Sequence, residues 1–423
     1  MRAERRLEQG LLNGVRLVTE EVEGANSVGL ACYIACGSGD DPEGQSGMAH
    51  LIEHLLFRGG TLSRQEIEQR DDELGGYLNA GTGGEHTEVT SLVLERDLER
   101  ELELMAAVIL GPDFASLDEE REVILAEIIE GEDDYDNRAN ELVMETLLPG
   151  HPLSRPHVGR PAELKTIGIE ELCLHHRSLY NAQSLVLAAV GAVNLERLTQ
   201  AAQPFAVVPQ GSLPSRPPFQ LHHPLVAFQQ KPSSGYLVRL AGPSLPWQER
   251  DWPSAALTAI LSRLDSARLT RALRHSGLVY DVSSYIGDYR SSGLVQINFT
   301  VDEEKLSRAL AVCLDELERL STDAISDQEV ALARSRMLTR LELGANDHDS
   351  SADLLADHVL SGQPVLDYYQ DIDLVASITT AEIRKLTEPF APERLSLLCV
   401  GPDEAVWQRA LASLSRSLPV LGH

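Results

Sequence analysis

The two halves of this chain carry the same succession of features, and this duplication limits the folds open to it. Residues 166–193 (TIGIEELCLHHRSLYNAQSLVLAAVGAV) read as a capped helix, an aromatic residue, a short turn and an apolar strand ending in Gly191. Residues 377–403 (SITTAEIRKLTEPFAPERLSLLCVGPD) repeat that order about 210 residues later, with Gly401 at the strand end. The agreement of order, spacing and offset predicts two duplicated domains.

A proline-rich stretch lies between the two halves. Residues 203–224 (QPFAVVPQGSLPSRPPFQLHHP) contain prolines at 204, 209, 214, 217, 218 and 224. Prolines at this density remove backbone donors and disfavour helix, which is typical of a linker. We therefore divide the chain into a first domain of residues 1–203, a linker of residues 204–224 and a homologous second domain of residues 225–423.

Apolar periodicity places strands and helices in both halves. Strands are expected at residues 14–21, 27–35, 184–193, 225–229, 235–240 and 293–301. Helices are expected at residues 47–57, 64–74, 95–110, 118–130, 137–148, 255–275, 303–322 and 326–343. Strands that alternate with blocks of helices favour an α+β fold, in which each domain is a mainly antiparallel sheet covered by helices.

The charge of the chain excludes some partners. Its 36 basic and 65 acidic residues give a formal net charge of −29, which argues against nucleic acid and anionic membranes. The charge is compatible with basic peptide substrates, although solubility explains most of it. No apolar run reaches the roughly 18–20 residues of a membrane-spanning helix, and the N-terminal residues contain no apolar secretory segment. Five scattered cysteines without a CxxC pair indicate thiols, so we expect a cytoplasmic protein.

The segment GMAHLIEHLLFRGGT, residues 47–61, brings metal-binding residue types together on one helix. His50 and His54 are four residues apart and share a helical face, so both imidazoles can reach one ion. Glu53 lies on the same side, where a carboxylate can take a proton from a water on zinc. Such a short pattern also arises by chance, and an amphipathic helix with two histidines can be merely a packed surface.

A third ligand is available downstream, in LDEEREVILAEIIEGEDD (residues 117–134). Glu120 and Glu127 are seven residues apart, which places them on one helical face. Glu127 stands among isoleucines and a leucine, where a carboxylate needs a strong partner. Glu127 is therefore the candidate third ligand, and Glu120 a candidate for orienting a ligand or the water. Acidic residues on helices are more often simply solvated.

These motifs resemble the inverzincin zinc peptidases of the pitrilysin and insulinase family, whose mark is H-x-x-E-H. The likeness is strongest to short bacterial members similar to mitochondrial processing peptidase. It covers nearly the whole chain and includes three runs: GSGDDPEGQSGMAHLIEHLLFRGGT (residues 37–61), ELGGYLNAGTGGEHTEVTSLVL (residues 73–94) and EREVILAE (residues 120–127).

The resemblance implies one Zn²⁺ per chain, bound by His50, His54 and Glu127, with Glu53 as the catalytic base. It implies that the N-A-x-T run, with Asn79, Ala80 and Thr82, lies on an edge strand that captures the peptide backbone by β-augmentation. It further implies that the two domains form half of a clamshell peptidase chamber for unstructured peptides, and that the second domain carries no metal ligands.

The resemblance also covers RLTRALRHSGLVYDVSSY, residues 268–285. Active relatives have an arginine and a tyrosine here that steady the substrate carbonyl, which implies Arg274 and Tyr280 in this chain. Their spacing is one residue shorter than the usual pattern. Three readings stay open: the pair acts in trans on another copy, a different subunit supplies it, or Arg274 is a surface residue and Tyr280 a core residue.

The leading interpretation is a zinc endopeptidase that hydrolyses unstructured peptides or short proteins in a dimeric chamber, with precursor-peptide processing as one such role. The main alternative is a non-catalytic accessory subunit of a heteromeric peptidase-like complex. Such subunits usually lose ligands, whereas this sequence retains three ligands and the base. A metal-binding protein without hydrolytic activity would not need Glu53. The sequence leaves homodimer and heterodimer equally open.

Overall fold

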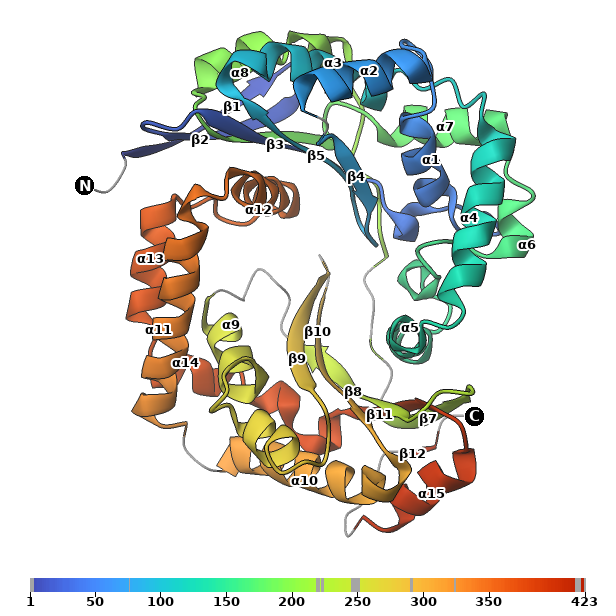
Figure 1. Cartoon of the computed structure of the whole chain (residues 1–423), viewed down its shortest axis with the longest axis vertical. Helices are drawn as coiled ribbons and strands as arrows, with labels where there is room; N and C mark the ends of the chain where they lie inside the picture. Colours follow the sequence, from blue (N-terminus) through green and yellow to red (C-terminus); the bar gives the residue numbers. More distant parts are fainter. Residues whose placement is uncertain are drawn as a thin grey trace. The chain divides into compact units, whose positions relative to one another are not determined.

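The computed structural model describes residues 4–75, 77–217, 221, 224–244, 252–289, 292–322, 325–414 and 420–421. These residues form two six-stranded sheets with helices around each (Figure 1). The expected α+β class with two similar domains is confirmed. Residues 218–220 and 222–223 of the expected linker lie outside the described part. No helix in the described ranges is both long and apolar enough to cross a membrane.

The first sheet has the strand order β1-β2-β6-β3-β5-β4. Only β2 and β6 pair in parallel, and the other neighbours are antiparallel. Its strands are β1 (Arg5–Leu12), β2 (Val15–Val22), β3 (Ser27–Ile34), β4 (Asn79–Thr82), β5 (Thr87–Leu94) and β6 (Leu185–Gly191). The strands expected at 14–21, 27–35 and 184–193 are therefore present. Strands β1, β4 and β5 were not predicted from periodicity.

The second sheet has the order β12-β7-β11-β8-β10-β9. Its strands are β7 (Leu225–Gln230), β8 (Tyr236–Ser244), β9 (Val282–Tyr289), β10 (Ser292–Val301), β11 (Ser396–Gly401) and β12 (Val420–Leu421). Strands β7 to β11 pair as β2 to β6 do, including one parallel pair, β7 with β11. Gly191 and Gly401 end the corresponding strands β6 and β11, so the duplication inferred from the sequence extends to strand order and direction.

The helices of the first half are α1 (Met48–Leu56), α2 (Arg64–Leu74), α3 (Leu98–Leu110), α4 (Leu117–Gly131), α5 (Tyr135–Leu147), α6 (Pro161–Leu164), α7 (Ile169–Leu179) and α8 (Leu195–Ala201). Those of the second half are α9 (Trp252–Thr258), α10 (Glu303–Thr322), α11 (Asp327–Leu343), α12 (His348–Ser361), α13 (Tyr368–Ser377), α14 (Thr380–Lys385) and α15 (Glu404–Ala412).

The single helix expected at residues 255–275 is wrong. Helix α9 ends at Thr258 and is followed by π-helical turns at Ala259–Arg263 and Thr270–Arg274, with Leu264 in extended conformation between them. Two hydroxyl groups bond at the break: Thr270 Oγ1 donates to the Ser262 carbonyl, and Ser262 Oγ accepts from the amide of Ser284 on β9. The periodicity of apolar residues does not show where hydroxyl side chains form hydrogen bonds with the backbone, so it does not predict this break.

Each of the two compact units contains a helix from the other half of the sequence. The first unit comprises Met1–Ile129, Arg155–Pro217 and Gly344–Asp371, and the second comprises Glu130–Ser154, Pro218–Leu343 and Ile372–His423. Helix α12, from the second half, packs on β3 and β6, whereas α5, from the first half, packs on β8 and β11. The boundaries at 203 and 224 therefore separate the two sheets but not the two compact units.

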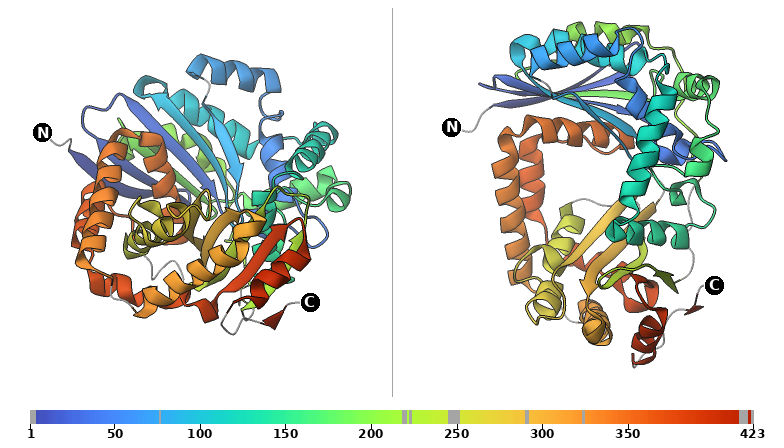
Figure 2. Two further views of the ribbon diagram at one scale, coloured as in Figure 1. Left: turned by 60° about the horizontal axis from the view of Figure 1, so that its bottom comes forward. Right: turned by 45° about the vertical axis from the view of Figure 1, so that its right-hand side comes forward.

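The exchange explains why the central strands are apolar on both faces. In the first unit, α12 crosses one face of the sheet while α2, α3 and α8 lie over the other (Figures 1 and 2). Tyr33 and Val190 pack against α12, whereas Leu30 and Cys32 face the main core. Strands buried on both faces read as continuous apolar runs, which is the pattern of β3 and β6.

Candidate metal centre

Helix α1 is held at its N-terminus by a buried carboxylate that sequence reasoning missed. Oδ2 of Asp41 accepts hydrogen bonds from the amides of Gly47 (2.7 Å) and Met48 (3.2 Å), and Oδ1 accepts one from Ala49 (2.9 Å). These are unpaired donors of the first helical turn, and a negative group is favourable there. Burial raises the pKa of Asp41 to about 7, against the lowering effect of those amides. The only sequence signal for this cap was an Asp-Pro turn just before the helix.

Packing sets the orientation of α1. Its apolar residues are buried against the sheet and neighbouring helices: Met48, Ala49, Leu51, Ile52, Leu55 and Leu56. His50, Glu53 and His54 lie on the opposite face and stay partly exposed. The 3.6-residue period thus determines which face carries the polar site, as expected from the sequence.

The structure brings His50, His54 and Glu127 together. One donor atom from each lies within 4.8 Å of the others, and they form the one such group among the described residues. Oε2 of Glu127 on α4 is 4.0 Å from Nε2 of His50 and 3.7 Å from Nε2 of His54. Tetrahedral zinc with bonds of about 2.0–2.1 Å requires donor separations of about 3.4 Å, so small side-chain adjustments suffice.

The protonation of the site suits a metal. Burial, followed by the neighbouring His54 and His157, lowers the pKa of His50 to about 4, so the imidazole is neutral near pH 7. Neutral imidazole is the form that ligates metal. Two imidazoles and one carboxylate are a donor set that zinc accepts with a coordination position left open. The residues therefore fit the ion that the sequence implied.

Glu120 lies behind His54. It is 3% exposed, and its Oε2 is 3.3 Å from Nδ1 of His54, on the other side of the ring from the candidate metal position. Arg58 forms an ion pair with the same carboxylate, with Nε 2.6 Å from Oε1. A carboxylate that accepts from the outer nitrogen of a ligating histidine fixes the ring and its tautomer. Arg58 was missed, since it lies two residues beyond the end of α1, where helical spacing no longer predicts its direction.

Glu53 contacts the edge strand. Oγ1 of Thr82 on β4 donates a 2.7 Å hydrogen bond to Oε2 of Glu53. Burial raises the pKa of Glu53, and the charges of Glu127 and Glu88 act in the same direction, while Thr82 and His54 oppose the shift. Thr82 was expected from the sequence to bind substrate, and its bond to Glu53 was not predicted.

Strand β4 is the edge of its sheet, next to β5, and it packs against α1. The Gly83 amide donates to the His86 carbonyl. Hydrogen-bonded pairs alternate along an antiparallel ladder, so Gly81 and Asn79 bond to β5. The backbone groups of Ala80 and Thr82 consequently point to the free edge, where an extended peptide can pair with them.

Arg274 and Tyr280 lie in the second compact unit. Tyr280 is 93% exposed, which excludes the reading of it as a core residue. Arg274 is also exposed and lines a polar cavity of about 350 Å³ together with Arg263, Asp265, Asp281 and neighbouring serines.

Two family descriptions match the chain, which has the fold and candidate site of a metallopeptidase. "Insulinase (Peptidase family M16)" matches residues 16–160, and "Peptidase M16 inactive domain" matches residues 166–337. The chain belongs to peptidase family M16.

Relatives agree with this assignment. The chain is 27% identical over 417 residues to an uncharacterized zinc protease of Mycobacterium tuberculosis, covering 93% of this chain and 92% of the relative. It is 24% identical over 421 residues to the mitochondrial-processing peptidase subunit beta of Blastocladiella emersonii, covering 94% and 88%. A crystal structure titled as a peptidase M16 inactive domain, from Pseudomonas fluorescens, superposes with a TM-score of 0.86 at 19% identity, covering 99% and 100%.

Proposed function

We propose that this chain is a zinc endopeptidase with one Zn²⁺ per chain, held by His50, His54 and Glu127. The observation that carries the proposal is the convergence of those three donors beside Glu53, a carboxylate tied by Thr82 to the free edge strand. A structural zinc site is normally closed by four protein ligands. Three donors with a partly buried carboxylate beside them are the arrangement of a hydrolytic site.

Glu53, Glu120 and Thr82 have different roles in the proposed reaction. Zinc, when bound, supplies polarisation of a water molecule and of the scissile carbonyl. Glu53 accepts the proton of the attacking water and passes it to the leaving amine, and burial favours this role because it raises the pKa of the carboxyl. Glu120 holds the ring of His54, while Thr82 fixes the Glu53 carboxylate so that it reaches the nucleophile in one orientation.

The proposed substrates are unstructured peptides or short proteins, with basic peptides and precursor peptides as specific cases. The backbone groups of Ala80 and Thr82 face the free edge of β4, and Asn79 is exposed beside them. Only an extended segment can add a strand there. The net charge of −29 would attract positively charged peptides.

A second copy or a related subunit is proposed to complete a dimeric chamber, with Arg274 and Tyr280 acting in trans on the substrate carbonyl. The exposure of both side chains in the second unit supports this role, since each is available to another surface. A relative named as a subunit, the mitochondrial-processing peptidase subunit beta, makes a heterodimer an equal candidate. Nucleic acid and membrane are not proposed partners, and the proposed location is the cytoplasm.

The test is hydrolysis of a mixed set of unstructured peptides by the purified, zinc-loaded chain, with Glu53→Gln as the matched control. We expect one zinc per chain in both proteins and cleavage only by the wild type. Cleavage that persists in Glu53→Gln would overturn the role of Glu53. One bound zinc without cleavage by either protein would instead favour an accessory subunit, and addition of a second, related chain would then distinguish an incomplete enzyme from an inactive one.

A further inference from the structure

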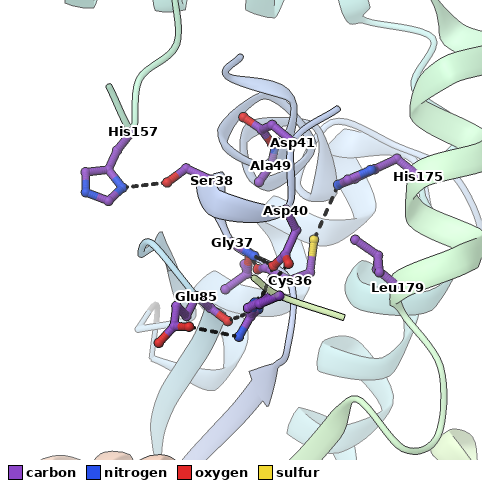
Figure 3. A network of polar contacts seen from close by, with 12 residues as sticks. Cys36, Gly37, Ser38, Asp40, Asp41, Ala49, Glu85, His157, His175 and Leu179 are labelled. Atoms are coloured by element: carbon purple, nitrogen blue, oxygen red, sulfur yellow. Dashed lines mark hydrogen bonds and ion pairs between the residues drawn. The ribbon is translucent and has the colours of Figure 1, made fainter. Parts of the chain in front are cut away.

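Two neighbouring aspartates on the loop before α1 point to different partners. Asp41 caps α1, as described above. Asp40 turns the other way: its Oδ2 accepts from the Gly37 amide at 2.9 Å, and its side chain is 5% exposed (Figure 3). The loop of residues 37–41 thus connects the helix that carries the candidate ligands with a second, buried acidic group.

Arg216, from the proline-rich stretch, binds that second group. Its Nε donates to Oδ1 of Asp40 at 2.9 Å and its Nη2 to Oδ2 at 2.5 Å, a two-pronged pair with the side chain of Arg216 only 13% exposed. The same guanidinium donates to the carbonyl of Glu85, and its Nη1 lies 3.6 Å from the Glu85 carboxylate. One arginine therefore joins three segments: the loop 37–41, the β4–β5 turn and the proline-rich stretch.

The β4–β5 turn already touches the loop at this place. The amides of Ser38 and Gly39 donate to the carbonyls of Gly83 and Gly84, at 3.0 and 2.8 Å. The approach is so close that a Cβ on Gly37 would lie 2.6 Å from the Gly84 and Glu85 backbone. Thr82, the partner of Glu53, immediately precedes Gly83, so the position of this turn determines where the strand β4 passes Glu53.

We propose that Arg216 is a positioning residue for peptide capture: its guanidinium locks the β4–β5 turn onto the loop that caps α1 and so sets β4 beside Glu53. This inference rests on the proposed function of β4 and α1. Arg216 contacts neither the three candidate ligands nor Glu53 in the described structure. Its loss should therefore weaken peptide binding while leaving the metal donors in place.

Arg216→Gln removes the charge and the two-pronged geometry, and Arg216→Lys keeps the charge but loses the fork. We expect KM for a cleaved unstructured peptide to rise about tenfold in Arg216→Gln and less in Arg216→Lys, because a displaced capture strand weakens peptide binding. We expect kcat to fall by a smaller factor than KM rises, because Thr82 moves with the strand, and zinc stoichiometry to stay that of wild type. The matched control is Arg197→Gln, which removes a comparable forked arginine that binds Glu95 and Glu99 on the same unit.

Amide hydrogen exchange tests the same point without activity. Residues 79–86 should exchange faster in both Arg216 variants than in wild type, while α1 remains protected; Arg197→Gln should leave both segments unchanged. If Arg216→Gln does not fold, both measurements are made on Arg216→Lys.

Wild-type KM together with wild-type exchange at residues 79–86 overturns the inference, as does loss of kcat and zinc without a change in KM. An inactive wild type would contradict the proposed function alone, since the exchange result still decides whether Arg216 holds the strand.

Discussion

Thr82 Oγ1 and Glu53 Oε2 are 2.7 Å apart, and this hydrogen bond joins the edge strand β4 to the helix α1. One bond thereby couples the strand on which a peptide would pair with the carboxylate that would handle the proton. Because Thr82 donates to the ionised carboxylate, it opposes the raised pKa that burial gives Glu53. Binding and proton transfer at this site are consequently linked through one hydroxyl.

Replacing Thr82 by valine should change the acidic limb of the pH–activity profile. Valine keeps the shape and removes the donor, so the pKa of Glu53 should rise further. A hydrogen bond to a charged group is worth about 1.5–3 kcal/mol, so its loss should be visible in the pH profile. Since Glu53 must be ionised to accept a proton, activity in Thr82→Val should begin at higher pH than in wild type. Thr82→Ser, which retains the hydroxyl, should keep the wild-type profile, and identical profiles for all three proteins would contradict this role.

Removing the charge of Glu120 should weaken zinc binding without removing a ligand. Glu120→Gln cannot hold the ring of His54 as a carboxylate does, and it leaves the ion pair with Arg58 broken. Substitutions behind a ligating histidine cost about 10- to 100-fold in metal affinity. Competition with a chelator of known affinity measures the loss. Glu119→Gln, an exposed neighbour on the same helix, should leave the affinity unchanged; equal losses in both variants would show that only the overall charge of the helix matters.

Two buried histidines should make the protein less stable in mild acid. Burial is the main cause that lowers the pKa of both His175 and His176 to about 4, from 6.5. A folded pKa below the unfolded value means that the unfolded chain binds protons first. Stability is therefore complete above about pH 6.5 and is lost as pH falls toward 4, by about 3 kcal/mol for each histidine.

His176→Phe isolates one of these contributions. Nε2 of His176 is 2.9 Å from the Ile109 carbonyl, and the ring stacks on Tyr180 with centroids 4.2 Å apart. Phenylalanine keeps the stacking, so urea unfolding should show a lower stability at pH 7 but a smaller fall between pH 6.5 and 4. His275→Phe, at an exposed position, should retain the wild-type dependence. A variant whose stability falls as steeply as that of wild type would exclude His176 as a source of the pH dependence.

The sequence predicted those helices and strands in which the apolar residues of the local pattern are also the residues that are buried. Helices α1, α2 and α10 follow from apolar periodicity, and α1 with α4 determine where His50, His54 and Glu127 can meet. What it missed depends on contacts distant in the chain. Asp41 caps a helix from outside it, Thr82 reaches Glu53 across 29 residues, and Arg216 reaches Asp40 across 176 residues. No period or spacing encodes such partners, since their geometry arises only after the sheet has formed.

The packing of α12, a helix of the second half, on the first sheet depends on a glycine. A Cβ at Gly29 on β3 would lie 2.2 Å from the carbonyl oxygen of His348, the first residue of α12. Because that contact is with backbone, Gly29→Ala must push the helix off the sheet face that it covers. We expect a loss of about 3 kcal/mol or more in the free energy of unfolding, together with faster proteolysis within residues 344–371. Gly344→Ala is the matched control, since a Cβ there meets nothing within 4 Å. The stability of Gly344→Ala should be that of wild type. A Gly29→Ala protein as stable as wild type would show that α12 can shift on β3 at little cost. The close approach at Gly29 would then not be what holds α12 in place.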